Sequence, residues 1–185
     1  MMTHMPPQLQ PDNTLLLVVD LQDKLLPAMH EAQACIAAAR KLIDAAKVLK
    51  LPILATEQYP AGLGKTTAEI ATALGDAPIY EKTRFSACVE PVLQRIAELR
   101  RPNILIAGIE AHVCVQQTVL DLLRLGQLPC VCADAITSRR PLDRDIAIAR
   151  MRQAGAIITT VESAIFELLG QASGDSFKQI LRIVK

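Results

Sequence analysis

Short apolar runs alternate with stretches of helical periodicity along most of the chain, and this alternation limits the possible folds more than any other feature. Residues 14–20 and 103–109 form nearly unbroken apolar runs, which suit parallel strands covered on both faces. Apolar residues recur at helical spacing over residues 32–50. This order predicts right-handed βαβ units in an α/β three-layer sandwich, with a six-stranded parallel sheet in the order 3-2-1-4-5-6.

The same patterns place the individual elements. We expect strands at residues 14–20, 52–57, 79–82, 103–109, 129–135 and 156–160. We expect helices at residues 32–50, 67–74, 91–100, 143–154, 162–169 and 176–184, and a further helix that starts near Cys114 and stops at Gly126. The last helix carries an apolar stripe of Phe177, Ile180, Leu181 and Val184.

Length and composition exclude several classes of protein. The 185 residues fit one domain at residues 14–185, preceded by a flexible arm at residues 1–13 that does not resemble a secretory signal. A net charge of +1 and an aromatic content of 3% give no basic or stacking surface for nucleic acid. No apolar stretch is long enough to span a membrane. The five cysteines form no disulfide framework, which favours a cytoplasmic location.

Three residues with catalytic chemistry fall at the carboxyl ends of predicted strands. Asp20 ends the first strand, Lys82 ends the third, and Cys114 follows the fourth. In the predicted sheet order, Asp20 and Cys114 flank the point where strand order reverses, and Lys82 reaches in from the side. A helix N-terminus and a nearby ammonium both stabilise a thiolate, so we predict a lowered pKa for the Cys114 thiol.

Each of these residues also has an ordinary structural explanation. An Asp at a strand end is often a helix cap, a Lys after a strand is usually solvated, and a Cys in a first helical turn is more often part of the core. Their joint placement at three strand ends favours catalysis, in which a carboxylate takes the thiol proton and later gives it to a leaving amine.

Five motifs carry a resemblance to a known family: VVDLQ at 18–22, KTRFS at 82–86, GIEAHVCV at 108–115, DAITSR at 134–139 and ESAIFE at 162–167. Over residues 14–167 the chain resembles the isochorismatase-like cysteine hydrolases, which include nicotinamidases and N-carbamoylsarcosine amidohydrolases. The TEQYP loop at 56–60 and the FK pair at 177–178 are most similar to the isochorismatase domain-containing proteins of that family.

The resemblance implies a role for each of the three strand-end residues. Cys114 is the implied nucleophile, Asp20 the general acid and base, and Lys82 their electrostatic partner. The resemblance also implies a cis peptide between Ile109 and Glu110, an oxyanion hole formed by the backbone amides of Glu110 and Cys114, and assembly into a homo-oligomer that is a dimer, a tetramer or larger.

The chain departs from the family at the position of a metal site. Nicotinamidases place an Asp-x-His-x-x-His motif after the second strand, where this chain has Glu57, Gln58 and Tyr59. Its histidines, His4, His30 and His112, are too scattered for a zinc site. We therefore expect no metal, no nicotinamidase activity and, without a G-x-G-x-x-G motif, no cofactor.

Six residues around the strand ends are candidate contacts for a small-molecule substrate: Gln22, Tyr59, Arg84, Phe85, His112 and Arg139. Either arginine is able to hold a carboxylate bidentately, although arginines are more often surface residues. His112 fits a pocket lining and an exposed turn equally well. Residues 59–66 approach a P-loop, but Tyr59 replaces its first glycine, so a flexible substrate-side loop is the better interpretation.

The sequence therefore predicts a cysteine hydrolase that cleaves a small amide, or a related C–N or acyl bond, through a thioester on Cys114. One alternative is isochorismatase-type hydrolysis of a vinyl ether by acid catalysis, which needs no cysteine. Another is a non-catalytic oligomeric binding protein that keeps the family fold.

Overall fold

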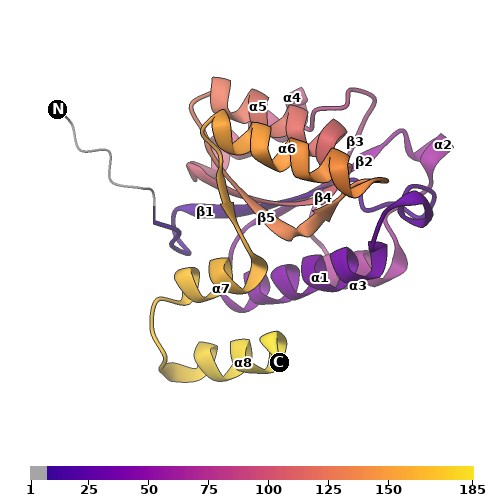
Figure 1. The fold of residues 1–185 in the computed structure, drawn as a ribbon. Helices are drawn as coiled ribbons and strands as arrows, with labels where there is room; N and C mark the ends of the chain where they lie inside the picture. Colours follow the sequence, from indigo (N-terminus) through magenta and orange to yellow (C-terminus); the bar gives the residue numbers. More distant parts are fainter. Residues whose placement is uncertain (1–7) are drawn as a thin grey trace.

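The computed structural model describes residues 8–185, which form an α/β sandwich around one parallel sheet (Figure 1). The six strands have the predicted order β3-β2-β1-β4-β5-β6. Their bounds are β1 (Thr14–Val19), β2 (Ile53–Gln58), β3 (Ile79–Lys82), β4 (Asn103–Ile109), β5 (Leu128–Thr137) and β6 (Ile157–Thr159). Strand β1 lies between β2 and β4, so its last residue, Val19, pairs with Thr56 on one side and Gly108 on the other.

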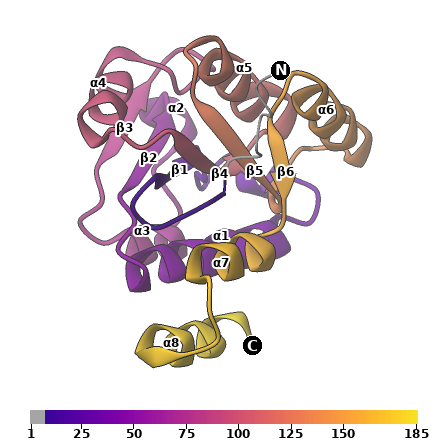
Figure 2. The ribbon, with the colours of Figure 1, turned by 90° about the vertical axis from the view of Figure 1, so that its left-hand side faces the viewer.

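Helices cover both faces of the sheet, as Figure 2 shows. One face carries α1 (Ala32–Val48), α3 (Ala68–Leu74) and α7 (Val161–Leu169), with α8 (Gly174–Val184) packed outside α1 and α7. The other face carries α4 (Glu90–Leu99), α5 (Gln116–Arg124) and α6 (Pro141–Gln153). Three short turns complete the fold: η1 (Leu26–Ala28), α2 (Pro60–Leu63) and the π-helical turn η2 (Ala111–Val115).

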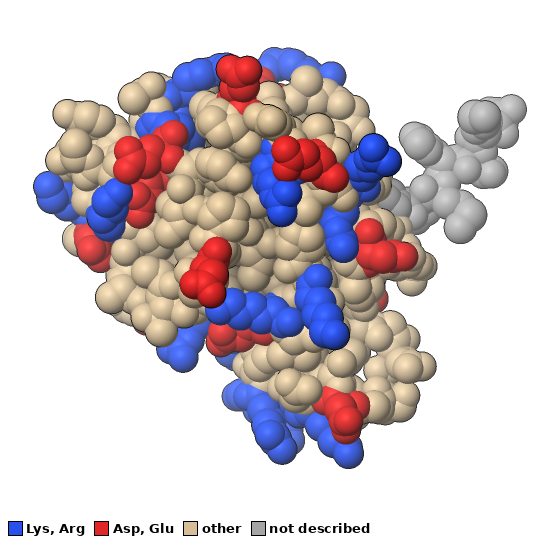
Figure 3. All heavy atoms as spheres, turned by 180° about the vertical axis from the view of Figure 1, so that it is seen from behind, with Lys and Arg blue, Asp and Glu red and all other residues tan. Residues whose placement is uncertain are grey.

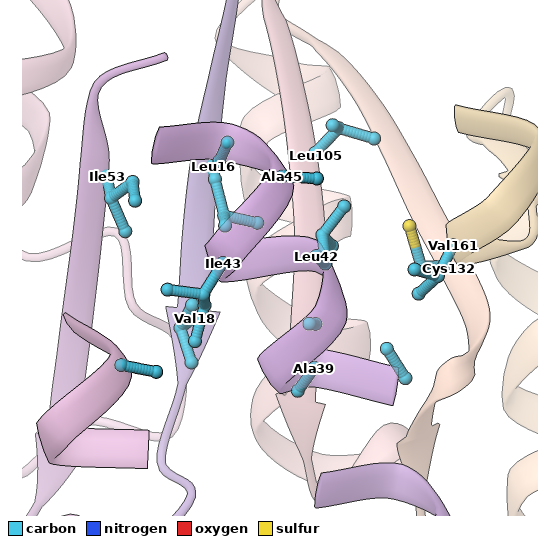
Figure 4. Packing of buried hydrophobic residues seen from close by; sticks show 14 of the residues in the cluster. Leu16, Val18, Ala39, Leu42, Ile43, Ala45, Ile53, Leu105, Cys132 and Val161 are labelled. Carbon is cyan, nitrogen blue, oxygen red and sulfur yellow. The ribbon is translucent and has the colours of Figure 1, made fainter. Parts of the chain in front are cut away.

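The unbroken apolar run of β1 is explained by burial on both faces. Leu16 and Val18 point into the cluster beneath α1, where they meet Leu42 and Ile43 (Figure 4). Leu15, Leu17 and Val19 point the opposite way, into the cluster beneath α4, α5 and α6. Successive side chains of a strand alternate between faces, so a strand covered on both sides has no polar position.

The segment before β1 contacts the rest of the domain through Leu9. Leu9 is buried, and its amide donates a hydrogen bond to Glu167 Oε1 at 2.8 Å. Leu9 thus packs against the domain next to α7, and the flexibility of the arm stays a prediction. Residues 1–7 of the predicted arm lie outside the described residues.

The apolar stripe of α8 finds its partner within the same chain. Ile180 is fully buried, whereas Phe177, Leu181 and Val184 are partly buried, and the helix packs against α1 and α7. The stripe is thus covered by its own domain and gives no separate argument for an oligomer. Within residues 8–185 no helix is both long and apolar enough to cross a membrane.

Charged side chains are dispersed over the surface. On the face seen in Figure 3, Lys and Arg alternate with Asp and Glu, and no broad area carries a single sign. This pattern agrees with the net charge of +1 and offers nucleic acid no extended basic surface on that face.

Candidate active site

The sheet order brings two of the predicted residues into direct contact. Asp20 follows β1 and Lys82 ends β3, with β2 between them. The Lys82 side chain crosses the end of β2, and its Nζ lies 2.6 Å from Asp20 Oδ2. Both side chains are completely buried. A buried charge is tolerated only when it is paired and hydrogen-bonded, so each residue depends on the other.

Asp20 is held by its backbone as well as by its carboxylate. Its φ angle of +52° lies in the left-handed region, which non-glycine residues adopt only when surrounding contacts impose it. The Asp20 amide donates to the Thr56 carbonyl at 3.1 Å, and the Thr56 hydroxyl donates to Oδ1 at 2.7 Å. Both carboxylate oxygens therefore have a fixed donor.

The Lys82 ammonium has more acceptors than Asp20 alone. Its Nζ donates to Gln58 Oε1 at 2.8 Å and to the Phe85 carbonyl at 2.9 Å, with the Arg84 carbonyl at 3.2 Å. Gln58 is fixed in turn, because its Nε2 donates to the Thr83 carbonyl at 2.8 Å. The ammonium is thus satisfied by the loop that follows β3.

Cys114 lies in the π-helical turn η2, between β4 and α5, and the preceding Ile109–Glu110 peptide bond is cis. Gly108 lets β4 pass close to β1 at this point, since a Cβ there would lie 2.0 Å from the Val19 carbonyl oxygen and its φ is +133°. The Thr118 hydroxyl donates to the Cys114 carbonyl at 2.7 Å and accepts from the Ala87 amide at 2.8 Å. The turn is therefore tied to the loop after Lys82.

The environment of the Cys114 thiol is unlike the one predicted. Burial, together with the negative charge of Asp20, raises the pKa of Cys114 to about 12, against the opposing charge of Lys82. A hydrogen bond with Asp20 raises this pKa as well, whereas one from the Glu110 amide lowers it. The predicted lowered pKa is wrong, because Lys82 is already neutralised by Asp20 and the site excludes water.

The raised pKa by itself does not distinguish Cys114 from the other cysteines. Burial also raises the pKa of Cys35 and of Cys130 to about 12, and that of Cys88 to about 11. All five cysteines are free and buried. What is particular to Cys114 is its hydrogen bond with a carboxylate that an ammonium accompanies.

A groove of about 490 Å³ opens beside Lys82. Besides Lys82, it is lined by Tyr59, Pro60, Ala61, Glu81, Thr83, Arg84 and Val89. Tyr59 and Phe85 are exposed, and the guanidinium of Arg84 is also exposed, with its nearest carboxylate, that of Asp121, 4.0 Å away. Two of the predicted substrate contacts, Tyr59 and Arg84, thus line the same groove.

Two other predicted contacts are paired within the protein. Arg139 Nε donates to Glu110 Oε2 at 2.8 Å, and His112 Nδ1 lies 2.9 Å from the Ser138 hydroxyl. Both contacts join the turn after β4 to the end of β5. Arg139 is therefore occupied by a carboxylate of its own chain, and a substrate carboxylate would have to compete with Glu110.

Gln22 occupies a different place from the one expected of a substrate contact. It is fully buried, its Oε1 accepts from the Gln58 amide at 2.7 Å, and its Nε2 donates to the carbonyls of Gln58 and Gly64. Its side-chain amide is used up by the backbone, so Gln22 ties the end of β1 to the end of β2.

The sequence reasoning missed Thr56, Gln58 and Thr118 as parts of the site. Thr56 and Gln58 hold Asp20 and Lys82, and Thr118 holds the Cys114 turn. One signal was present for the first two, because polar residues end a strand that is otherwise apolar and lie beside Asp20 in the predicted order.

The position of the nicotinamidase metal motif is occupied by Glu57, which binds protein groups instead. Its carboxylate accepts hydrogen bonds from the Thr66 amide and hydroxyl and from Lys65. Across residues 8–185, the structure contains no cluster of three or more His, Cys, Asp or Glu side chains suited to a metal ion.

Curated relatives match almost the whole chain. Isochorismatase domain-containing protein 2A of Mus musculus is 41% identical over 177 residues, covering 95% of this chain and 84% of its own length. The secreted isochorismatase effector Isc1 of Phytophthora sojae is 38% identical over 183 residues, covering 96% of this chain and 87% of its own.

Solved structures share the fold closely. The MAR1 ribonuclease of Caenorhabditis elegans has a TM-score of 0.93 at 40% identity, over 96% of this chain and 92% of its own. YcaC of Pseudomonas aeruginosa was solved with hexane-2,5-diol and covalent acrylamide. It has a TM-score of 0.92 at 26% identity, and the match covers 98% of this chain and 93% of its own. The Escherichia coli YcaC product is described as an octameric hydrolase of unknown specificity. It has a TM-score of 0.92 at 25% identity, and the match covers 98% of this chain and 91% of its own.

A model of one protein family matches most of the chain. This model describes the isochorismatase domain and covers residues 14–163. The match spans every strand of the sheet and all three strand-end residues. Together with relatives about 40% identical over most of the chain, it establishes that the protein belongs to the isochorismatase domain family.

Proposed function

We propose that this protein is a cysteine hydrolase of a small amide, or of a related C–N or acyl bond, with Cys114 as nucleophile. The observation that carries the proposal is the oriented Asp20 carboxylate, which Lys82 and Thr56 hold in place and which is close enough to raise the pKa of the Cys114 thiol. A nucleophile paired with an oriented base is the arrangement that covalent hydrolysis requires.

The raised pKa of Cys114 decides how the thiol is activated. With a pKa near 12, only on the order of one thiol in 10⁵ is ionised at pH 7. A preformed thiolate therefore contributes little, and a base must remove the proton as the sulfur attacks. Asp20 is hydrogen-bonded to the thiol and is the group that performs this role.

The reaction then proceeds in two balanced steps. The sulfur of Cys114 bonds to the carbonyl carbon while its proton passes to Asp20, and that proton leaves with the amine as the C–N bond breaks. Water then attacks the thioester, giving a proton to Asp20, and the acid product departs as the sulfur recovers a proton. Lys82 offsets the buried charge of Asp20 throughout.

Backbone amides are the donors that we propose for the oxyanion of each step. The Glu110 amide is one proposed donor, because it lowers the pKa of the Cys114 thiol, and the Cys114 amide is the proposed second donor. Tyr59, Arg84, Phe85, His112 and Arg139 remain candidate substrate contacts.

Two solved structures add support through their own descriptions. YcaC of Pseudomonas aeruginosa carries covalent acrylamide, an electrophile that reacts with thiols. The Escherichia coli YcaC product is described as an octameric hydrolase. We extend both features to this chain as proposals, namely a reactive thiol and a homo-oligomer.

The acid-catalysed alternative is less well supported by the geometry. Cleavage of a vinyl ether needs a proton on the substrate-facing oxygen of Asp20. Oδ1 accepts a hydrogen bond from Thr56 and Oδ2 accepts one from Lys82, so both oxygens act as acceptors. In the proposed mechanism, Asp20 donates a proton to the substrate only after it has taken that proton from Cys114.

A hydrolysis screen over small amides, ureides, carbamoyl compounds and vinyl ethers tests the proposal, with RNA included because one structural neighbour is described as a ribonuclease. We expect turnover of a C–N or acyl substrate and a trapped thioester on Cys114. Turnover of vinyl ether or RNA alone would overturn it. Alkylation of Cys114 no faster than that of Cys88 would favour the non-catalytic alternative.

Assembly and location have separate tests. We propose a homo-oligomer, and light scattering of the purified protein checks it, since a fully active 20.1 kDa species would contradict it. We also propose a cytoplasmic location, on the basis of five free cysteines, although one relative is described as a secreted effector. Cell fractionation distinguishes a cytoplasmic protein from a secreted one.

A further inference from the structure

Residues 59–66, called segment 59–66 below, form one wall of the groove beside Lys82. The segment connects β2 to α3 and contributes Tyr59, Pro60 and Ala61 to the groove. The opposite wall begins at Lys82 and continues to Arg84. Lys82 is the residue that the groove shares with the buried pair, since it lines the groove and its Nζ binds Asp20.

Segment 59–66 has almost no core of its own. Its only helix, α2, has four residues and buries none of them, and Thr66 is the one buried residue of the segment. A helix of this length is not stable by itself. The position of the segment is therefore set by polar contacts with its neighbours.

Glu57 provides three of these contacts from a buried position. Its Oε1 accepts hydrogen bonds from the Thr66 amide at 2.6 Å and from the Thr66 hydroxyl at 2.8 Å, and its Oε2 accepts one from Lys65 Nζ at 3.2 Å. Hydrogen bonds to an ionised acceptor are about twice as strong as neutral ones. Gln22 adds another, from its Nε2 to the Gly64 carbonyl at 2.6 Å.

The ring of Tyr59 follows the position of the segment. A Cβ on Gly62 would lie 2.3 Å from Tyr59 Cε1, so the ring packs directly over this glycine. The Gly62 amide also donates to the Tyr59 carbonyl at 3.0 Å. A shift of α2 therefore carries the Tyr59 ring with it.

We propose that Glu57 is a positioning residue for substrate binding, which holds segment 59–66 and the Tyr59 ring at the groove. The inference rests on the proposed hydrolase function, in which the groove receives the part of the substrate beyond the scissile bond. Thr56 and Gln58 contact Asp20 and Lys82, whereas Glu57 points to the other face of β2. Glu57 therefore acts on substrate binding and leaves the step at Cys114 unchanged.

The test compares Glu57→Gln with the control Glu69→Gln. Glu69 is an exposed carboxylate on α3 that pairs with Arg40 and does not line the groove, whereas Glu57 binds Thr66 and Lys65. The chain has two tyrosines and no tryptophan, so a Tyr80→Phe background leaves Tyr59 as the single fluorescent side chain. Quenching of its emission by iodide reports the exposure of the ring without any substrate.

For Glu57→Gln we expect KM to rise about tenfold and kcat to stay within about twofold, as for the loss of one charged hydrogen bond in binding. Iodide quenching of Tyr59 should increase as α2 and the ring move away from the groove together, and the rate of Cys114 alkylation by iodoacetamide should not change. Glu69→Gln should match the parent protein in all four measurements.

Unchanged Tyr59 quenching in Glu57→Gln would overturn the proposal, as would a loss of kcat or of Cys114 alkylation at constant KM. If no substrate is found, the proposed function fails, whereas the quenching result still decides whether Glu57 holds the wall. If Glu57→Gln does not fold, Thr66→Val, which removes one of the three bonds, should show the same pattern at a smaller size.

Discussion

The buried pair of Asp20 and Lys82 and segment 59–66 are both anchored at the end of β2, and they are built in opposite ways. The pair is fully buried, and its atoms are fixed from three strand ends at distances of 2.6–2.8 Å. The segment is largely exposed, and polar contacts hold it: side-chain bonds from Glu57, Gln22 and Lys24, and backbone bonds to Asp23, Lys24 and Lys82. The proposed chemistry is thus placed on strand ends, while the wall of the groove is a loop held by polar contacts.

Three consecutive residues of β2 divide this work. Thr56 and Gln58 face Asp20 and Lys82, and Glu57 faces Thr66 and Lys65. Because strand side chains alternate between faces, a single strand end supports the buried pair, which we propose to be catalytic, and the wall independently. Substitutions on the two faces should therefore separate the chemical step from substrate binding.

Removal of the nucleophile should have the largest effect on activity. Cys114→Ser is expected to lower kcat by at least about 10³-fold, because a hydroxyl is a far weaker nucleophile in the same geometry. Cys88→Ser, the control, should keep full activity, since Cys88 lies outside the Asp20 contacts. Steady-state kinetics with thermal melting check both, and near-full turnover by Cys114→Ser would assign the chemistry to Asp20 alone.

Breaking the buried pair should have the largest effect on stability. Lys82→Met leaves the Asp20 carboxylate without its counter-charge, which we expect to lower the free energy of unfolding by about 3–5 kcal/mol. The double variant Asp20→Asn with Lys82→Met should recover part of that loss, because no unpaired charge remains. Urea denaturation measures the cycle, and strictly additive losses would show that the two groups are not coupled.

Loss of the Thr56 hydroxyl should produce a smaller change on the same face of β2. Thr56→Val keeps the shape of the side chain but removes the hydrogen bond to Asp20 Oδ1, so we expect kcat to fall about tenfold while KM stays constant. Thr72→Val on α3 is the control, since its hydroxyl bonds only to the exposed Ala68 carbonyl. A rise in KM for Thr56→Val would contradict the idea that one face of β2 affects the chemical step and the other affects substrate binding.

Acid should loosen the wall of the groove. Burial raises the pKa of Glu57, but hydrogen bonds from Thr66 and Lys65 outweigh burial and hold this pKa below its ordinary value of 4.5. The stabilisation from Glu57 is therefore complete above pH 4.5 and is lost as pH falls through the lower, folded-state pKa. Iodide quenching of Tyr59 in the Tyr80→Phe background should rise at that point.

The pH transition has its own control. Glu57→Gln has no carboxylate to protonate, so its Tyr59 quenching should be high at every pH and show no such step. A step of equal size in Glu57→Gln would assign the acid transition to another group, Glu81 or Asp23 among the nearest carboxylates on the neighbouring chain segments.

Much of the site was predictable because strand ends meet at one edge of a parallel sheet. Asp20, Lys82 and Cys114 were placed from the apolar runs before them, and the sheet order follows from βαβ connectivity. The contacts of Gln22 were not predictable, because nothing in VVDLQ shows that its amide would be used by the backbone of Gln58 and Gly64.

The sequence by itself determined the strands, their order and the residue types at their ends, since local periodicity and connectivity are properties of the chain. Only the tertiary structure decided the sign of the Cys114 pKa shift, the packing of Leu9 and the role of Glu57. Those features depend on which charges and donors approach each group and on how much water is excluded. Both are set by segments far apart in the sequence, which meet only after folding.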